Sequence, residues 1–141
     1  MNTVKGSCFC GKVAFQITPP TLFCGHCHCS MCRRPHGAPF VTWVGVPMEQ
    51  FEITHGQEDL RTFTSSEHGR RQFCATCGSQ LFCYHLNKQG QPKFMDVTLA
   101  SLKGQIDRQP EAHFYYDSKA DWVEANDTLP KLGGPQGNQP L

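Results

Sequence analysis

The 141-residue chain has the length of one domain of ordinary size, and its thirteen basic and twelve acidic side chains leave a formal net charge of +1. This balance argues against a basic nucleic-acid-binding surface and against an acidic tail, and no apolar run approaches the roughly 18 residues of a membrane-spanning helix. The unusual feature is a set of nine cysteines, accompanied by seven histidines. The role of these thiols is the main question that the sequence raises.

Short apolar or alternating segments, bounded by glycine and proline, run along the whole chain and predict strands. In chain order they are 12–17, 39–44, 51–54, 60–64, 80–84, 94–99 and 113–116. No segment keeps a helical apolar period over three turns, and the best helical candidate is about one turn at 30–34, closed by Pro35. The pattern therefore predicts an all-β domain of short, twisted strands.

We expect a single domain over residues 1–127. The segment 128–141 ends in glycine, proline and polar residues and buries too little apolar surface to offset its ordering entropy, which predicts a flexible C-terminal tail. The first residues have neither the apolar segment nor the cleavage site of a secretory signal, so we expect a cytoplasmic protein with reduced thiols. The odd number of cysteines also excludes complete disulfide pairing within the chain, and metal binding becomes the favoured role.

The first candidate metal site combines two pairs of cysteines that lie far apart in the sequence. Cys8 and Cys10 form a C-x-C pair, whereas Cys74 and Cys77 form a C-x2-C knuckle followed by Gly78. Together they supply the four thiolates of a closed, structural zinc site. The long intervening segment is no obstacle, because the cost of closing a loop rises only logarithmically with its length. The alternative is that either pair is a buried or redox-active dithiol.

The second candidate site has only three obvious ligands. Cys27, Cys29 and Cys32 lie within six residues, and three protein ligands with one open position are typical of a catalytic zinc. An open position beside three thiolates suits a soft incoming ligand such as a thiol. Four nearby side chains are candidates to close the site and make it structural: Cys24, His26, His28 and His36.

The order of these motifs resembles that of a known family. The residues that carry the resemblance are 6–13 (GSCFCGKV), 27–33 (CHCSMCR), 37–40 (GAPF), 73–78 (FCATCG) and 113–122 (HFYYDSKADW). On these motifs the chain looks like a glutathione-dependent formaldehyde-activating enzyme, of the group that also includes centromere protein V. The combination of three cysteine groups is specific, whereas any one of them alone would not be.

The resemblance implies an all-β, Mss4-like fold with two zinc ions per chain. It implies that Cys8, Cys10, Cys74 and Cys77 hold a structural zinc and that Cys27, Cys29 and Cys32 hold a second, catalytic one. The implied activity is that of a carbon–sulfur lyase, which joins formaldehyde to glutathione as S-hydroxymethylglutathione or splits that adduct. Glutathione would then be the co-substrate, and Arg33 is the nearest candidate partner for one of its carboxylates.

The remaining polar and aromatic candidates have ordinary roles in this interpretation. His28 is expected to face away from the metal, with a role as general base as the alternative. His113 is expected to be a partly buried and hydrogen-bonded histidine, and Cys83 a small buried side chain within a strand. Phe40, Trp43 and Trp122 are expected in the core, and Arg70, Arg71 and Lys119 at the surface.

Two other functions compete with the lyase. The first is a non-catalytic zinc-binding module for a protein or nucleic-acid partner, although the net charge and the absence of a basic run argue against nucleic acid. The second is a thiol redox protein that uses Cys74 and Cys77, which would need an exposed thiol of low pKa. The favoured partners are thus a small thiol and an aldehyde, with neither nucleic acid nor a membrane.

Overall fold

The computed structural model describes residues 2–141 and is mainly β. Its internal contacts divide the chain into two compact units, each built from two separate segments. The first unit contains residues 1–22 and 44–107, and the second contains 23–43 and 108–141. The sequence predicts one domain that ends at 127, whereas the second unit continues to the C-terminus.

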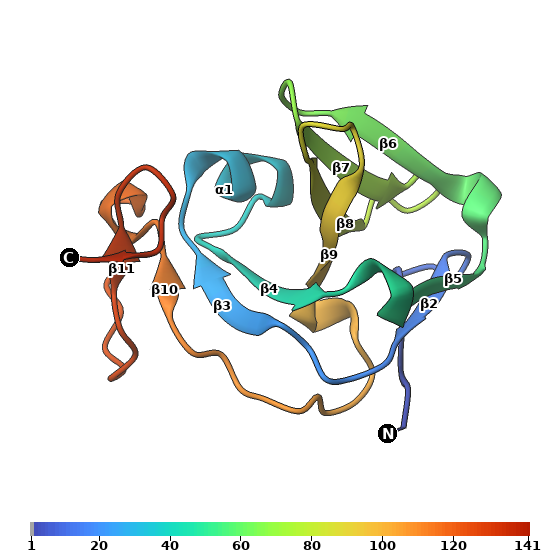
Figure 1. The fold of residues 1–141 in the computed structure, drawn as a ribbon, viewed down its shortest axis with the longest axis horizontal. Helices are drawn as coiled ribbons and strands as arrows, with labels where there is room; N and C mark the ends of the chain where they lie inside the picture. The colour runs from blue at the N-terminus through green and yellow to red at the C-terminus, as the bar shows by residue number, and fades with distance from the viewer. Residues whose placement is uncertain (1) are drawn as a thin grey trace. The chain divides into compact units, whose positions relative to one another are not determined.

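The first unit consists of antiparallel strands. A three-stranded sheet has the order β1-β2-β5, formed by Val4–Ser7, Ala14–Ile17 and Phe51–His55. A second group has the order β9-β8-β7-β6 and appears as yellow and green arrows in Figure 1. Its strands are β6 (Leu60–Thr64), β7 (Gly69–Cys74), β8 (Gln80–Leu86) and β9 (Pro92–Thr98). Short 3-10 turns at Met48–Gln50, Gln57–Asp59 and Leu99–Ser101 complete the unit.

Aromatic side chains form the core of the first unit. Phe15 of β2 and Phe82 of β8 are 1% exposed and meet edge to face, with ring centroids 4.8 Å apart. Phe51 of β5 packs on Phe82 at 4.9 Å in the same manner. Edge-to-face pairs contribute about 0.5–1.5 kcal/mol each beyond their buried area, so these rings hold the two groups of strands together.

The second unit contains the only α-helix of the described residues. Strand β3 (Phe23–Cys27) leads into α1 (Ser30–His36), and β10 (His113–Phe114) pairs with β3 in parallel. A 3-10 turn at Tyr116–Ser118 follows β10. Strand β4 (Val41–Val46) is the neighbour of β3, and it begins in the second unit and ends in the first.

The C-terminal segment, for which the sequence predicts a flexible tail, contains two short strands. Strands β11 (Leu132–Gly133) and β12 (Gln139–Pro140) pair antiparallel. Two hydrogen bonds tie this ribbon to the rest of the second unit, from Tyr115 N to the Gly137 carbonyl and from Gly134 N to Asp117 Oδ2. Composition does not reveal such contacts.

Helix α1 also continues beyond the expected single turn. Pro35 lies inside it, and the helix ends at His36, before Gly37, which adopts the left-handed conformation with φ of 57°. A proline in the last turn removes one backbone donor without breaking the turns before it. No helix among residues 2–141 is long and apolar enough to cross a membrane.

Candidate metal centres

The first centre is the four-cysteine cluster of Cys8, Cys10, Cys74 and Cys77, which lies entirely within the first unit. Cys8 and Cys10 come from the turn between β1 and β2, and Cys74 and Cys77 from the end of β7 and the turn that follows. The four sulfur atoms lie within 4.8 Å of one another. The structure thus brings together the two pairs that the sequence predicts as partners.

Glycines shape both turns of the four-cysteine cluster. Gly11 follows Cys10 with φ of 81°, and Gly78 follows Cys77 with φ of 77°. Their N–H groups close the turns on the carbonyls of Cys8 and Cys74, at 3.2 and 2.8 Å. Positive φ is unfavourable for residues with a Cβ, so glycine at these positions lets both cysteines of each turn face one point.

The sulfur spacing of the four-cysteine cluster fits a tetrahedral zinc ion. Bonds of about 2.3 Å to a central zinc place two thiolates about 3.8 Å apart. The observed separations are 3.6 Å between Cys8 and Cys10 and 3.8 Å between Cys10 and Cys74. The cluster therefore has the donor atoms and the spacing for a closed tetrathiolate site.

Hydrogen bonds help to lower the pKa of two of the four thiols, those of Cys77 and Cys8. The Ser79 hydroxyl contacts the Cys77 sulfur at 3.2 Å and lowers the pKa of Cys77 to about 5. Val13 N donates to the Cys8 sulfur at 3.3 Å. Although burial opposes ionisation of Cys8, this N–H and the neighbouring thiols outweigh it and lower its pKa. Ser79 also accepts from Phe9 N at 3.0 Å and so links the two turns.

The second centre is the three-cysteine cluster of Cys27, Cys29 and Cys32, which belongs to the second unit. Cys27 ends β3, Cys29 precedes α1 and Cys32 lies within the helix. The sulfurs of Cys27 and Cys29 are 3.4 Å apart. Cys27 and Cys32 are buried, whereas Cys29 is half-buried, so the cluster is most accessible from the side of Cys29.

The three thiols cannot all ionise without a neutralising cation. The thiols of Cys29 and Cys32, followed by burial, raise the pKa of Cys27 far above its ordinary value. The indole N–H of Trp43 donates to the Cys32 sulfur at 3.4 Å and supports negative charge there. A bound divalent metal displaces thiol protons, and three converging sulfurs with this donor fit such an ion.

None of the four side chains that the sequence offers as a further ligand joins the three sulfurs in the described part of the chain. His26 Nδ1 lies 2.8 Å from the Thr42 hydroxyl, and the His36 ring stacks edge-on against Trp43. His28 turns its ring toward His113. Cys24 is fully buried and lies outside the cluster.

His28 belongs to a chain of hydrogen bonds that sequence reasoning missed and that runs from the interior to the surface. Its Nε2 lies 2.8 Å from His113 Nδ1, and His113 Nε2 lies 2.9 Å from Asp127 Oδ2. With Asp127 ionised, His113 Nε2–H donates to the carboxylate and His113 Nδ1 accepts from His28 Nε2–H. Interaction with His113 lowers the pKa of Asp127, and burial lowers that of His28 to about 4.

This relay, defined as His28, His113 and Asp127, holds the loop between two of the cluster's cysteines. The backbone of His28 is fixed as well, because its N–H donates to the Phe114 carbonyl at 2.9 Å and its carbonyl accepts from Arg33 Nε at 3.0 Å. Fourteen residues separate His113 from Asp127 without any motif, so only the fold reveals that they meet.

The relay yields a stability prediction. His113→Phe retains the ring volume but leaves His28 Nε2 buried without a partner, so we expect the free energy of unfolding to fall by about 1–3 kcal/mol. Asp127→Asn keeps an acceptor for His113 at an exposed position, and we expect a loss below about 1 kcal/mol. Urea denaturation of the three proteins measures both effects. Equal stability of His113→Phe and the wild type would contradict this role for the relay.

Arg33 is largely engaged with the protein backbone. Its Nε donates to the His28 carbonyl and its Nη2 to the Ser118 carbonyl at 3.1 Å. These bonds tie α1 to the turn after β10. A guanidinium carries five N–H donors, so Arg33 still offers donors beside the three-cysteine cluster.

For the other side chains, the structure confirms some of the predicted burial and corrects the rest. Trp43 and Cys83 are buried, at 6% and 4% exposed, and His113 is buried as well. Two predictions are wrong: Trp122 is 74% exposed instead of in the core, and Arg71 is 7% exposed instead of at the surface. Arg71 lies on β7 opposite Cys83, and its guanidinium Nη1 is itself buried.

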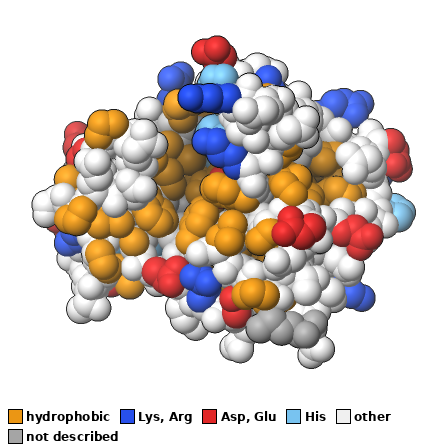
Figure 2. All heavy atoms as spheres, viewed as in Figure 1, with side chains coloured by type: hydrophobic (Ala, Val, Ile, Leu, Met, Phe, Trp, Pro, Cys, Tyr) orange, Lys and Arg blue, Asp and Glu red, His pale blue; other side chains and the backbone are white. Residues whose placement is uncertain are grey.

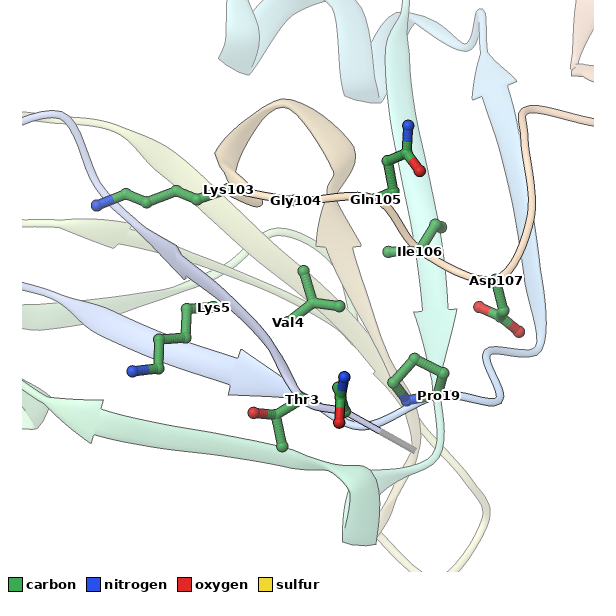
Figure 3. Close-up of a pocket in the computed structure, with 10 residues that line it drawn as sticks. Thr3, Val4, Lys5, Pro19, Lys103, Gly104, Gln105, Ile106 and Asp107 are labelled. Atoms are coloured by element: carbon green, nitrogen blue, oxygen red, sulfur yellow. The ribbon is translucent and has the colours of Figure 1, made fainter.

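A surface pocket of about 490 Å³ lies in the first unit, but its walls carry no cysteine or histidine. Figure 3 shows Lys5 and Lys103 extending to one side of it, with Val4 and Ile106 between other polar residues. Because the pocket carries neither cysteine nor histidine, it is separate from the two cysteine clusters. On the face shown in Figure 2, Lys and Arg are scattered among acidic and apolar side chains and form no extended basic surface.

Comparison with known proteins identifies a family and individual proteins to which this chain is similar. Residues 3–118 match the sequence profile of the family described as "Glutathione-dependent formaldehyde-activating enzyme". A Halomonas elongata protein named "Putative glutathione-dependent formaldehyde-activating enzyme" is 27% identical over 128 residues, which are 86% of this chain and 80% of that protein. The crystal structure of a Rhodobacter sphaeroides protein is similar with a TM-score of 0.56 and 26% identity, over 73% of this chain and 91% of that one.

Proposed function

Since the chain belongs to the glutathione-dependent formaldehyde-activating enzyme family and has its mainly β, Mss4-like fold, we propose that it is a zinc-dependent carbon–sulfur lyase. Its proposed reaction is the formation or cleavage of S-hydroxymethylglutathione from glutathione and formaldehyde. The observation that supports this proposal is the three-cysteine cluster, which offers three converging sulfurs and no fourth protein ligand among residues 2–141. A small thiol is the kind of ligand that suits the remaining position.

We assign a different task to each cluster. The four-cysteine cluster is the proposed structural zinc site, because four protein sulfurs leave no position for a substrate. The three-cysteine cluster is the proposed catalytic site. A zinc ion bound there would supply a binding position for the glutathione sulfur and favour its thiolate form near neutral pH.

The proposed reaction forms one bond and moves one proton. In the forward direction a bond forms between the glutathione sulfur and the formaldehyde carbon, the thiol loses its proton and the former carbonyl oxygen gains one. Cleavage reverses both changes. The protein's own residues fix the three sulfurs, through the relay behind His28 and through the Trp43 indole on Cys32.

Glutathione carries two carboxylates that need cationic partners. Arg33 is the proposed contact, since its guanidinium lies on α1 directly after Cys32 and two backbone carbonyls fix its position. An arginine can bind a carboxylate through two parallel N–H groups.

Exchange between formaldehyde and its glutathione adduct tests the proposed activity. NMR exchange spectroscopy on the zinc-loaded protein should show faster exchange than the same mixture without protein. Metal-free protein should return the rate to the uncatalysed value. An uncatalysed rate with fully zinc-loaded protein would instead support a non-catalytic zinc-binding module.

A further inference from the structure

Cys83, His85 and Asp96 form a third group of metal-ligating side chains, which we name the Cys–His–Asp group. One ligand atom from each residue lies within 4.8 Å of the others. All three belong to the first unit and none is part of either cysteine cluster. From this juxtaposition we propose that the Cys–His–Asp group is a third metal site, which binds a divalent transition-metal ion such as zinc and leaves a position for water.

Strand register explains why these side chains converge. Cys83 on β8 lies opposite Asp96 on β9, and side chains of directly opposed residues are close neighbours on one face of a sheet. His85 lies two residues after Cys83 and therefore points to the same face. The register of β8 and β9 shifts between Tyr84 and Leu86, and such irregularities can redirect a side chain toward its neighbours.

Strand β7 has no side chain at the position opposite the His85 imidazole. Gly69 on β7 lies opposite His85. A Cβ added at Gly69 would lie 3.6 Å from His85 Nε2 and less than 3 Å from the hydroxyls of Ser65 and Ser66. The His85 ring thus approaches the backbone of β7 at a position without a side chain.

The donor set selects the class of metal. A thiolate, an imidazole and a carboxylate are the ligands of zinc and related transition metals, whereas Mg²⁺ and Ca²⁺ prefer oxygen ligands alone. Cys83 is 4% exposed, while His85 is exposed. A metal ion can therefore enter from the side of His85 and reach the buried sulfur, whose proton passes to solvent on binding.

The positive charge of Arg71 should lower the affinity of the Cys–His–Asp group for a metal ion. Arg71 lies opposite Cys83 on β7 and is 7% exposed, so a buried positive charge flanks the Cys–His–Asp group. Because like charges repel more strongly where water is excluded, this site should bind zinc more weakly than the four-cysteine cluster. A chelator should remove its metal before that of the four-cysteine cluster.

Metal counting on the full chain tests the proposal. The wild type, His85→Ala and His68→Ala are reduced, equilibrated with zinc, separated from free metal and analysed by elemental mass spectrometry. We expect His85→Ala to hold about one zinc ion per chain fewer than the wild type. His68→Ala should hold the same number, because His68 is an exposed histidine outside every cluster of the described residues.

Cobalt provides a second measurement that does not depend on zinc counts. In the cobalt-loaded protein, Cys83→Ser should remove part of the thiolate-to-metal charge-transfer absorption, and His85→Ala should remove the same part. If His85→Ala matches the wild type in both zinc content and cobalt spectrum, the Cys–His–Asp group is not a metal site. That result would leave the proposed lyase untouched, because the two sites share no residue.

Discussion

Cys10→Ser should lower the stability of the protein more strongly than an ordinary surface substitution. Cys10 is exposed, so the change removes no core packing, but it takes one sulfur from the four-cysteine cluster. Apparent binding free energies of structural zinc reach about 10–16 kcal/mol, which is comparable to the entire stability of a typical domain. We expect a loss of at least about 3 kcal/mol, or a fall in Tm of about 10 °C or more.

Calorimetry together with metal analysis measures this effect, and Phe9→Ala is the matched control. Phe9 lies in the same turn, between the two cysteines, and is 94% exposed. Its loss should leave both Tm and zinc content near the wild-type values. Cys10→Ser protein that keeps its Tm while losing zinc would show that the four-cysteine cluster does not stabilise the fold.

Cys29→Ser should abolish the acceleration of formaldehyde–glutathione exchange while most of the fold survives. Cys29 is the least buried ligand of the three-cysteine cluster, and it precedes a helix of only seven residues. With two sulfurs left, the cluster should lose its zinc and with it the position for the glutathione sulfur. Removing a residue that hydrogen-bonds to a metal ligand typically lowers metal affinity or activity by about 10–100-fold. Removing the ligand itself should cost at least as much, so we expect the catalysed rate to fall by about 100-fold or more.

Met31→Ala is the control for this experiment. Met31 lies between Cys29 and Cys32 in the first turn of α1 and is 51% exposed, so we expect normal zinc content and a normal exchange rate. The comparison uses NMR exchange rates, zinc content and Tm for the three proteins. Cys29→Ser protein that loses one zinc ion but retains catalysis would disprove the catalytic assignment of the three-cysteine cluster.

The strand pattern was largely readable from the sequence. Each of the seven segments predicted as strands overlaps one of the observed strands, and 60–64 coincides with β6. The strands that local pattern missed include β3 (Phe23–Cys27) and β7 (Gly69–Cys74). Both combine glycine with cysteine and with polar or charged residues, which have low intrinsic strand preference. They become strands because neighbouring strands supply hydrogen-bond partners.

The two cysteine clusters were predictable for a different reason. Cysteines separated by one or two residues can reach a common point only through tight turns, and the glycines after Cys10 and Cys77 mark those turns. Local spacing therefore carries the metal-binding signal whatever the rest of the fold. Spacing alone could not decide whether Cys24 or a histidine closes the second cluster, because that depends on where each side chain points.

The sequence alone determined three features: the mainly β class, the grouping of seven cysteines into sets of four and three, and the resemblance to the family. Tertiary structure alone decided three other features: the relay of His28, His113 and Asp127, the pairing of β11 with β12, and the meeting of Cys83, His85 and Asp96. The physical reason is distance along the chain. Short-range turn geometry is encoded in neighbouring residues, whereas contacts between separate strands depend on register, and register is set by the whole sheet.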